Sequence, residues 1–148
     1  MPLVEESIHI DCPRDQVWGF MTNPENQALW QGSLIDLEYD DPEPKVGNIN
    51  KGTVRVAGKK MHWTAEITEV EDGKIWATQS IEAPVEFAIR ISLEDDGEGT
   101  KVTFRNESGS LGGFFGKLTD PLVVKLYTRD VQADLAKLKE LLEAGVDA

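Results

Sequence analysis

The sequence is poor in the residue types that most often carry chemistry. Cys12 is the only cysteine, so the chain can form neither an internal disulfide nor a cysteine-based metal cage. It has two histidines, His9 and His62, although histidine is the commonest general acid or base. The segment "GGFFGK" at 112–117 lacks the spacing and the hydroxyl residue of a phosphate-binding loop. We expect no metal and no cofactor, and the sequence identifies no catalytic residue.

Basic residues and long apolar runs are also scarce. Against 27 acidic residues stand 15 lysines and arginines, which gives a formal charge of −12. This charge disfavours nucleic acid and anionic membranes as partners, and it favours solubility. No stretch approaches the roughly 18 apolar residues of a membrane span, and the acidic start "MPLVEES" does not resemble a secretory signal. We therefore expect a cytoplasmic protein without stable membrane insertion.

Length and composition predict one domain over residues 1–148. A hydrophobic content of 40% is enough to bury a single core in a chain of this size. No repeat or low-complexity tract divides the sequence. We expect a monomer or a weak homodimer.

Two regions show the alternation that is typical of strands. In "LVEESIHID", Val4, Ile8 and Ile10 share one face. Residues 34–108 hold about six further strands, separated by turns such as "EDGK" at 71–74, where Asp-Gly is a hairpin signal. The pattern predicts an antiparallel meander of about seven strands.

Two short helices are expected between the first strand and the meander. The first begins after Asp11 or Cys12 as the cap, with Pro13 at its first position. The second is capped by Asn23, begins at Pro24 and ends at Trp30. Two interpretations of this tryptophan are open: either its ring fills the core, or it borders an opening.

The last third of the sequence predicts a long helix. One apolar stripe at helical spacing holds Val124, Val131, Leu135, Leu138 and Leu142. A second stripe points nearly the opposite way and holds Leu111, Phe115, Leu118, Leu122 and Leu126. Either the front half is apolar on all sides, or the chain bends at Pro121, which we favour because proline removes a backbone donor. The Gly-rich segment 112–116 is either a mobile apolar lid or a loop packed on the rim of the sheet.

Three segments carry a family resemblance: "CPRDQVWGFMTNPENQALWQG", "GTKVTF" and "DPLVVKLYTRDVQADLAKLKELLEA". In these and in the order of its elements, nearly the whole chain resembles the START-like or Bet v 1-like (SRPBCC) superfamily, and within it the bacterial polyketide cyclase/dehydrase-like proteins. The resemblance implies an α+β helix-grip fold. In this fold a curved seven-stranded antiparallel sheet, two short helices and a long C-terminal helix enclose a cavity for apolar small molecules. The fold alone does not define the function.

Alternation predicts which side chains enter this cavity, since the apolar face of an antiparallel sheet packs on the core. On the strand near residues 75–82 this rule turns Gln79 inward with Ile75, Ala77 and Ile81. Trp76 then lies on the outer face, either as a partly exposed ring or as a sign of a bulge. Gln79, Asn106 and one of Asn48 or Asn50 are the inward polar residues. Each either bonds to backbone or buried water, or orients a ligand.

The predicted cavity wall combines these inward residues with the helical ones. It consists of Trp30, Trp63, Gln79, Phe87, Phe104, Asn106, Phe115, Leu118, Leu122 and Tyr127. Tyr127 and Glu6 are the inward candidates for proton transfer, because both histidines fall on polar faces. The leading hypothesis is transport or sequestration of a small hydrophobic, lipid-like or polyketide-like molecule. The alternatives are a polyketide cyclase or dehydratase that uses the same cavity, and an interaction protein whose cavity is residual.

Overall fold

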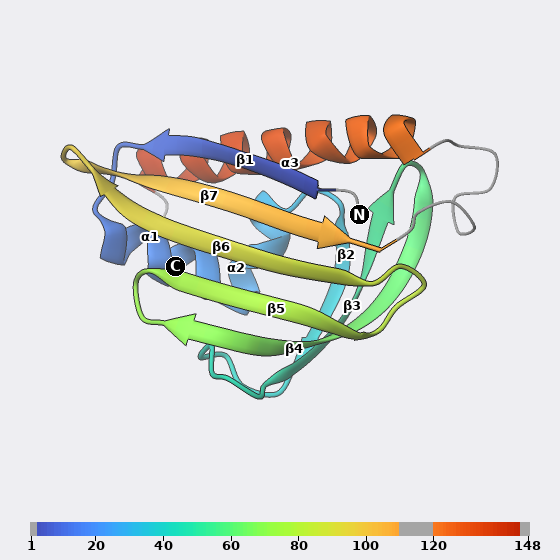
Figure 1. Cartoon of the computed structure of the whole chain (residues 1–148). Coiled ribbons are helices and arrows are strands. Elements are labelled where there is room, and N and C mark those ends of the chain that lie inside the picture. The colour runs from blue at the N-terminus through green and yellow to red at the C-terminus, as the bar shows by residue number, and fades with distance from the viewer. Residues whose placement is uncertain (1–2, 110–119, 146–148) are drawn as a thin grey trace.

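Seven strands form one antiparallel sheet in the order β1-β7-β6-β5-β4-β3-β2 (Figure 1). The structure, a computed structural model, describes residues 3–109 and 120–145. The strands are β1 (Leu3–Ile10), β2 (Leu34–Tyr39), β3 (Ile49–Val56), β4 (Lys59–Glu71), β5 (Ile75–Glu82), β6 (Phe87–Asp96) and β7 (Gly99–Ser108). The sheet curves around the helices, which confirms the predicted α+β helix-grip fold.

The two short helices are α1 (Arg14–Thr22) and α2 (Pro24–Trp30). The predicted cap of α2 is confirmed, because the Asn23 side chain accepts a hydrogen bond from the backbone N–H of Glu25 at 3.1 Å. The predicted start of α1 is wrong by one residue, since Pro13 is the N-cap and no side chain caps this helix. The Cys12 thiol points elsewhere and donates to the carbonyl of Leu142 at 3.4 Å.

The long helix α3 (Asp120–Glu143) places Pro121 in its first turn. A proline is tolerated there because the first N–H groups of a helix have no partner within it. The predicted bend at Pro121 involves the residues that precede α3, so it stays a prediction. Three residues of the second predicted stripe, Leu111, Phe115 and Leu118, lie outside the described residues, and so does the Gly-rich segment. No helix of the described ranges is long and apolar enough to cross a membrane.

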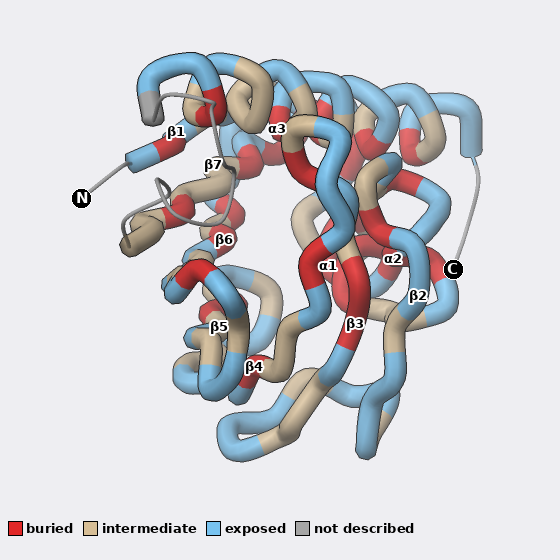
Figure 2. The backbone as a smooth tube through the Cα atoms, turned by 90° about the vertical axis from the view of Figure 1, so that its right-hand side faces the viewer, coloured by how far each residue is buried: buried red, intermediate tan, exposed pale blue. Residues whose placement is uncertain are grey.

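Helices α2 and α3 lie against the two edge strands of the curved sheet, and α1 contacts the inner strands β6 and β7. Helix α3 packs along the edge strand β1, while α2 contacts both the opposite edge strand β2 and α3. Figure 2 shows the buried parts of the chain on the surfaces that the sheet and helices turn toward one another. Val131, Leu135, Leu138 and Leu142 of α3 belong to this core, as the first apolar stripe predicts. The arrangement leaves an interior space between the sheet, α2 and α3.

The predicted orientation of β5 is wrong. Trp76 is only 6% exposed and pairs with Ile91, and Thr78 pairs with Ile89, so Trp76 and Thr78 share the inner face of the sheet. Gln79 consequently lies on the outer face and is exposed. Cross-strand pairing decides the face of a strand, because directly paired residues project to the same side.

Apolar residues on the outer face of β5 explain why alternation was misleading here. Ala77 is shielded because its neighbours on the two flanking strands, Glu69 and Arg90, form an ion pair across it. Ile81, also on the outer face, is 58% exposed. The register between β4 and β5 shifts directly before Glu69, but the extra residue lies on β4. Strand β5 itself keeps a continuous register with β6 from Ile75 to Gln79, so a bulge in β5 does not explain the position of Trp76.

Candidate functional site

A cavity of about 170 Å³ lies between the concave face of the sheet and helices α2 and α3. Its wall is mostly apolar and draws residues from α2, α3 and all strands except β2. An engineered cavity of about 150 Å³ holds benzene, so this space fits a ligand of one or two rings. The predicted wall residues that line it are Trp30, Trp63, Phe87, Phe104, Asn106 and Tyr127.

The remaining four predicted wall residues are not among the described residues that line the cavity. Gln79 is on the outer face of β5, where it is exposed because the inner position belongs to Thr78. Leu122 is 42% exposed on the first turns of α3, where Val123 is the buried residue. Phe115 and Leu118 lie outside the described residues. The prediction gave α3 two wall residues, Leu122 and Tyr127, whereas six described residues of this helix line the cavity: Val123, Val124, Tyr127, Val131, Asp134 and Leu135.

Trp63 and Phe87 form an aromatic corner of the wall. Their ring centroids are 6.1 Å apart with an interplanar angle of 87°, an edge-to-face arrangement. Gly52 on the paired strand makes room for the indole, since a Cβ atom there would lie 2.6 Å from Trp63 Cζ2. The missing side chain at Gly52 therefore allows the Trp63 ring to lie close to β3 and so determines the position of this part of the wall.

Trp30 belongs to both the core and the cavity wall. It is 2% exposed, packs in the main hydrophobic cluster and also lines the cavity. The two interpretations of this residue are thus compatible: the ring fills the interior and borders a space.

Three buried polar atoms of the wall have no hydrogen-bond partner within the described structure. They are the indole nitrogens (Nε1) of Trp30 and Trp76 and the amide oxygen (Oδ1) of Asn106. Leaving such a group unpaired costs about 1–3 kcal/mol. Two donors and one acceptor thus belong to residues that a molecule in the cavity would contact.

Asn106 and Tyr127 form a hydrogen-bonded pair in the wall. The Asn106 side chain donates through Nδ2 to the Tyr127 hydroxyl at 2.9 Å. Burial raises the pKa of Tyr127 to about 12, with a smaller contribution from the negative charges of Asp134 and Asp130, and the bond from Asn106 opposes the rise. The hydroxyl is therefore neutral near pH 7 and can donate its own hydrogen.

Asp134 is a wall residue that the sequence reasoning missed. Its Oδ1 accepts a hydrogen bond from the backbone N–H of Gly32 at 3.0 Å. Burial raises the pKa of Asp134 to about 7, Asp130 raises it further, and the Gly32 bond opposes the rise. The signal was present in the sequence, because Asp134 lies three residues after Val131 and four before Leu138 on the apolar stripe.

The other titratable candidates lie away from the cavity. His9 is exposed and contacts Asp96 at 2.8 Å. His62 is exposed and bonds through Nδ1 to Thr53 Oγ1 at 2.9 Å. Glu6 accepts a bond from the Gln132 side chain. Among the described wall residues, the groups that could transfer a proton are Asp134 and Tyr127, and the described ranges contain no cluster of three His, Cys, Asp or Glu side chains that could hold a metal.

A curved sheet that grips a long helix over an apolar cavity defines a class of small-molecule-binding folds. The sequence model of one family in this class, described as polyketide cyclase/dehydrase and lipid transport, matches residues 1–143. The chain belongs to this family. A search of curated proteins by sequence finds no match.

Solved structures share the fold over almost the whole chain. TTHA0849 from Thermus thermophilus is 24% identical with a TM-score of 0.83, and the alignment covers 97% of this chain and 99% of that one. The Zhui aromatase/cyclase from Streptomyces sp. R1128 is 22% identical with a TM-score of 0.78, covering 99% and 96%. The ginseng major latex-like protein 151 from Panax ginseng is 15% identical with a TM-score of 0.71, covering 94% and 95%. At these identities the likeness concerns the fold.

Proposed function

We propose that this protein binds a small, largely apolar molecule in the cavity and thereby sequesters or transports it. The observation that carries the proposal is an apolar wall whose residues include three buried polar atoms without a partner in the described part of the protein. Ligand sites combine these features, because apolar walls supply affinity and a few polar groups fix orientation. The volume of about 170 Å³ suits a compact molecule of one or two rings better than a long acyl chain.

The family supports the proposal in general terms, because its description includes lipid transport. The third hypothesis, an interaction protein with a residual cavity, predicts a collapsed interior. A cavity of this size argues against that hypothesis.

Native mass spectrometry of the protein purified from its own host tests the proposal. We expect a co-purifying small molecule whose mass adds to that of the polypeptide. Replacement of Ala65, a buried wall residue on β4, by Phe fills the cavity and should abolish the added mass. The same Ala→Phe change at Ala88, exposed on β6, is the matched control and should retain it. A protein that is empty and also fails to bind apolar dyes would contradict the proposal.

A cyclase or dehydratase activity is the second candidate function. Asp134 supports this second function, because a carboxyl with a pKa of about 7 can accept or donate a proton near neutral pH. Tyr127 lines the same cavity and could donate a hydrogen bond to a substrate carbonyl. The relative described as an aromatase/cyclase is consistent with such chemistry. The small volume, however, limits the substrate to a short chain.

Hydrogen–deuterium exchange tests this second candidate. If Asp134 removes a proton next to a carbonyl, the protein should accelerate exchange at the α carbons of 4-phenylbutan-2-one in D₂O. The proton passes from carbon to the carboxylate, solvent replaces it by a deuteron, and the deuteron returns to carbon. We expect Asp134→Asn to lose the acceleration. A wild-type rate equal to that of buffer would remove the support for catalysis.

A further inference from the structure

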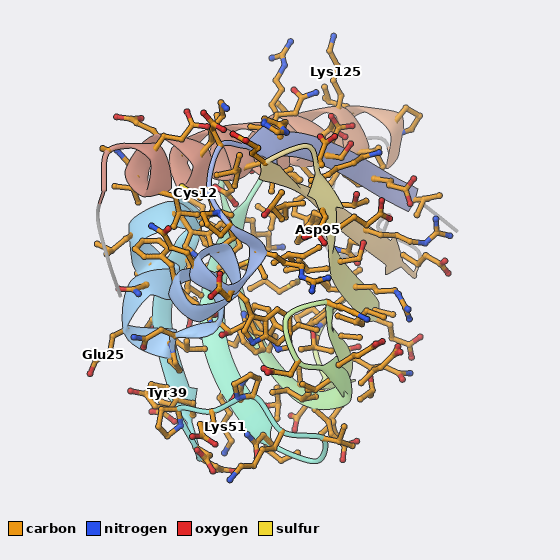
Figure 3. All side chains as sticks on the ribbon, turned by 90° about the vertical axis from the view of Figure 1, so that its left-hand side faces the viewer. Cys12, Glu25, Tyr39, Lys51, Asp95 and Lys125 are labelled. Atoms are coloured by element: carbon orange, nitrogen blue, oxygen red, sulfur yellow. The ribbon has the colours of Figure 1, made fainter. Side chains whose placement is uncertain are left out.

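The charge that the described wall residues bring to the cavity is negative only. Among its described residues, Asp134 is the only side chain that carries a charge near pH 7, and no lysine, arginine or histidine is present. Figure 3 shows two charged side chains on these helices, Lys125 of α3 and Glu25 of α2, projecting away from the body of the protein. A ligand in the cavity therefore meets one acid and no base in this part of the wall.

Charge selection follows from desolvation. An ion that leaves water needs a counter-charge and hydrogen bonds inside the protein, or its burial is strongly unfavourable. A carboxylate or phosphate in this cavity would find no cation among the described wall residues and would be repelled by Asp134. An ammonium group would find a carboxylate. A hydroxyl group could bond to Asp134 in either protonation state.

The surroundings of Asp134 leave it capacity to bind such a group. Gly32 occupies one position on Oδ1, and a carboxylate has about four acceptor positions. The wall residues contributed by the segment from α2 to β2 are uncharged: Gln27, Trp30, Gln31 and Ser33. The titratable groups that act on Asp134 are Asp130 and Tyr127, both on α3, and neither supplies a positive charge.

We propose that the cavity selects amine-bearing ligands of one or two rings over neutral ones, and neutral ones over carboxylates and phosphates, with Asp134 as the group that binds the ammonium. This inference rests on the proposed function and names its ligand class. The pKa of Asp134 adds a signature. At pH 7 about half of these carboxyls hold a proton, and binding an ammonium favours the ionised form, so part of a proton is released.

The test uses three probes that share one ring and a two-carbon arm: 2-phenylethylamine, 2-phenylethanol and phenylacetate. Isothermal titration calorimetry at pH 8 compares them on the wild type, on Asp134→Asn and on Glu140→Gln. Glu140 is an exposed acid of α3, so its variant carries the same change of net charge outside the cavity. Titrations of the amine at pH 7, in buffers of different ionisation enthalpy, measure proton release.

We expect the wild type to bind 2-phenylethylamine at least tenfold more tightly than phenylacetate, since hydrogen bonds to charged groups contribute about 1.5–3 kcal/mol. In Asp134→Asn the amine should bind no more tightly than 2-phenylethanol, and proton release should vanish. The alcohol should change less than threefold, and Glu140→Gln should match the wild type.

Two results would overturn the inference while leaving the proposed function intact. One is binding of phenylacetate as tight as that of the amine, and the other is an amine affinity unchanged in Asp134→Asn. Failure of all three probes to bind at millimolar concentration would instead count against the proposed function itself, and the inference would fall with it.

Discussion

Replacement of Asp134 by Asn should make the protein more stable, by an amount that grows between pH 3.8 and about 7 and is constant above pH 7. Burial raises the pKa of this carboxyl from 3.8 to about 7, so the folded state binds its proton more tightly than the unfolded state does. The stability contributed by the proton is complete below pH 3.8 and is lost as the pH rises through 7. An asparagine carries no such charge and can still accept the bond from Gly32 through its side-chain oxygen.

The magnitude follows from the pKa values. A difference of one pKa unit corresponds to about 1.4 kcal/mol, so a rise from 3.8 to about 7 corresponds to about 4 kcal/mol once the group is fully ionised. Asp134 is partly exposed, and solvent screens part of this cost. We therefore expect the free energy of unfolding of Asp134→Asn to exceed that of the wild type by about 2–4 kcal/mol at pH 8.5, and this difference to narrow as the pH falls from about 7 toward 5.

Urea denaturation of both proteins at half-unit steps from pH 5 to pH 9 measures this difference. The other carboxylates are common to both proteins and cancel in the comparison. Glu140→Gln is again the control. The difference between its free energy of unfolding and that of the wild type should not show the pH dependence expected for Asp134→Asn. The reasoning would be refuted if the difference in free energy of unfolding between Asp134→Asn and the wild type stayed constant across this pH range. Such a result would mean that Asp134 ionises normally in the folded state.

Three further substitutions test the core and the wall. Gly52→Ala should destabilise by about 1–3 kcal/mol in urea and shift the fluorescence of Trp63, because the new methyl would overlap the indole; an unchanged protein would contradict the packing. Leu138→Ala, at a position with 0% exposure in the core, should cost about 2–5 kcal/mol in the same assay yet leave ligand affinity unchanged, since this residue does not line the cavity. Asn106→Leu should remain folded by circular dichroism but weaken or redirect binding, because it removes a polar group and the partner of Tyr127; loss of folding would mark Asn106 as structural.

The architecture was predictable because its signals are local. Alternation on β4, β6 and β7, the Asn23–Pro24 helix start and the stripe on α3 each depend on residues within one element. For β4, β6 and β7 the apolar face is also the inner face, so Trp63, Phe87 and Phe104 line the cavity as expected. The short-range pattern was therefore sufficient for most of the described wall.

Two parts of the site depend on contacts between distant segments. The face of β5 is decided by the pairing of Trp76 with Ile91, and its own sequence offers apolar residues on both sides. The environment of Asp134 depends on Gly32, which lies 102 residues earlier in the chain. No local pattern encodes either contact, although an acid at helical spacing on an apolar stripe is a signal worth testing in similar sequences.

The occupancy of the cavity is tested most directly by the indole N–H signals of the four tryptophans in a ¹⁵N–¹H correlation spectrum. Trp30, Trp63 and Trp76 line the cavity, whereas Trp18 does not and serves as the internal control. Titration with 2-phenylethanol should shift the first three signals in a saturable manner and leave that of Trp18 in place. Ala65→Phe should abolish the shifts. Signals that stay unchanged throughout the titration, or that all move together without saturation, would contradict a ligand site in this cavity.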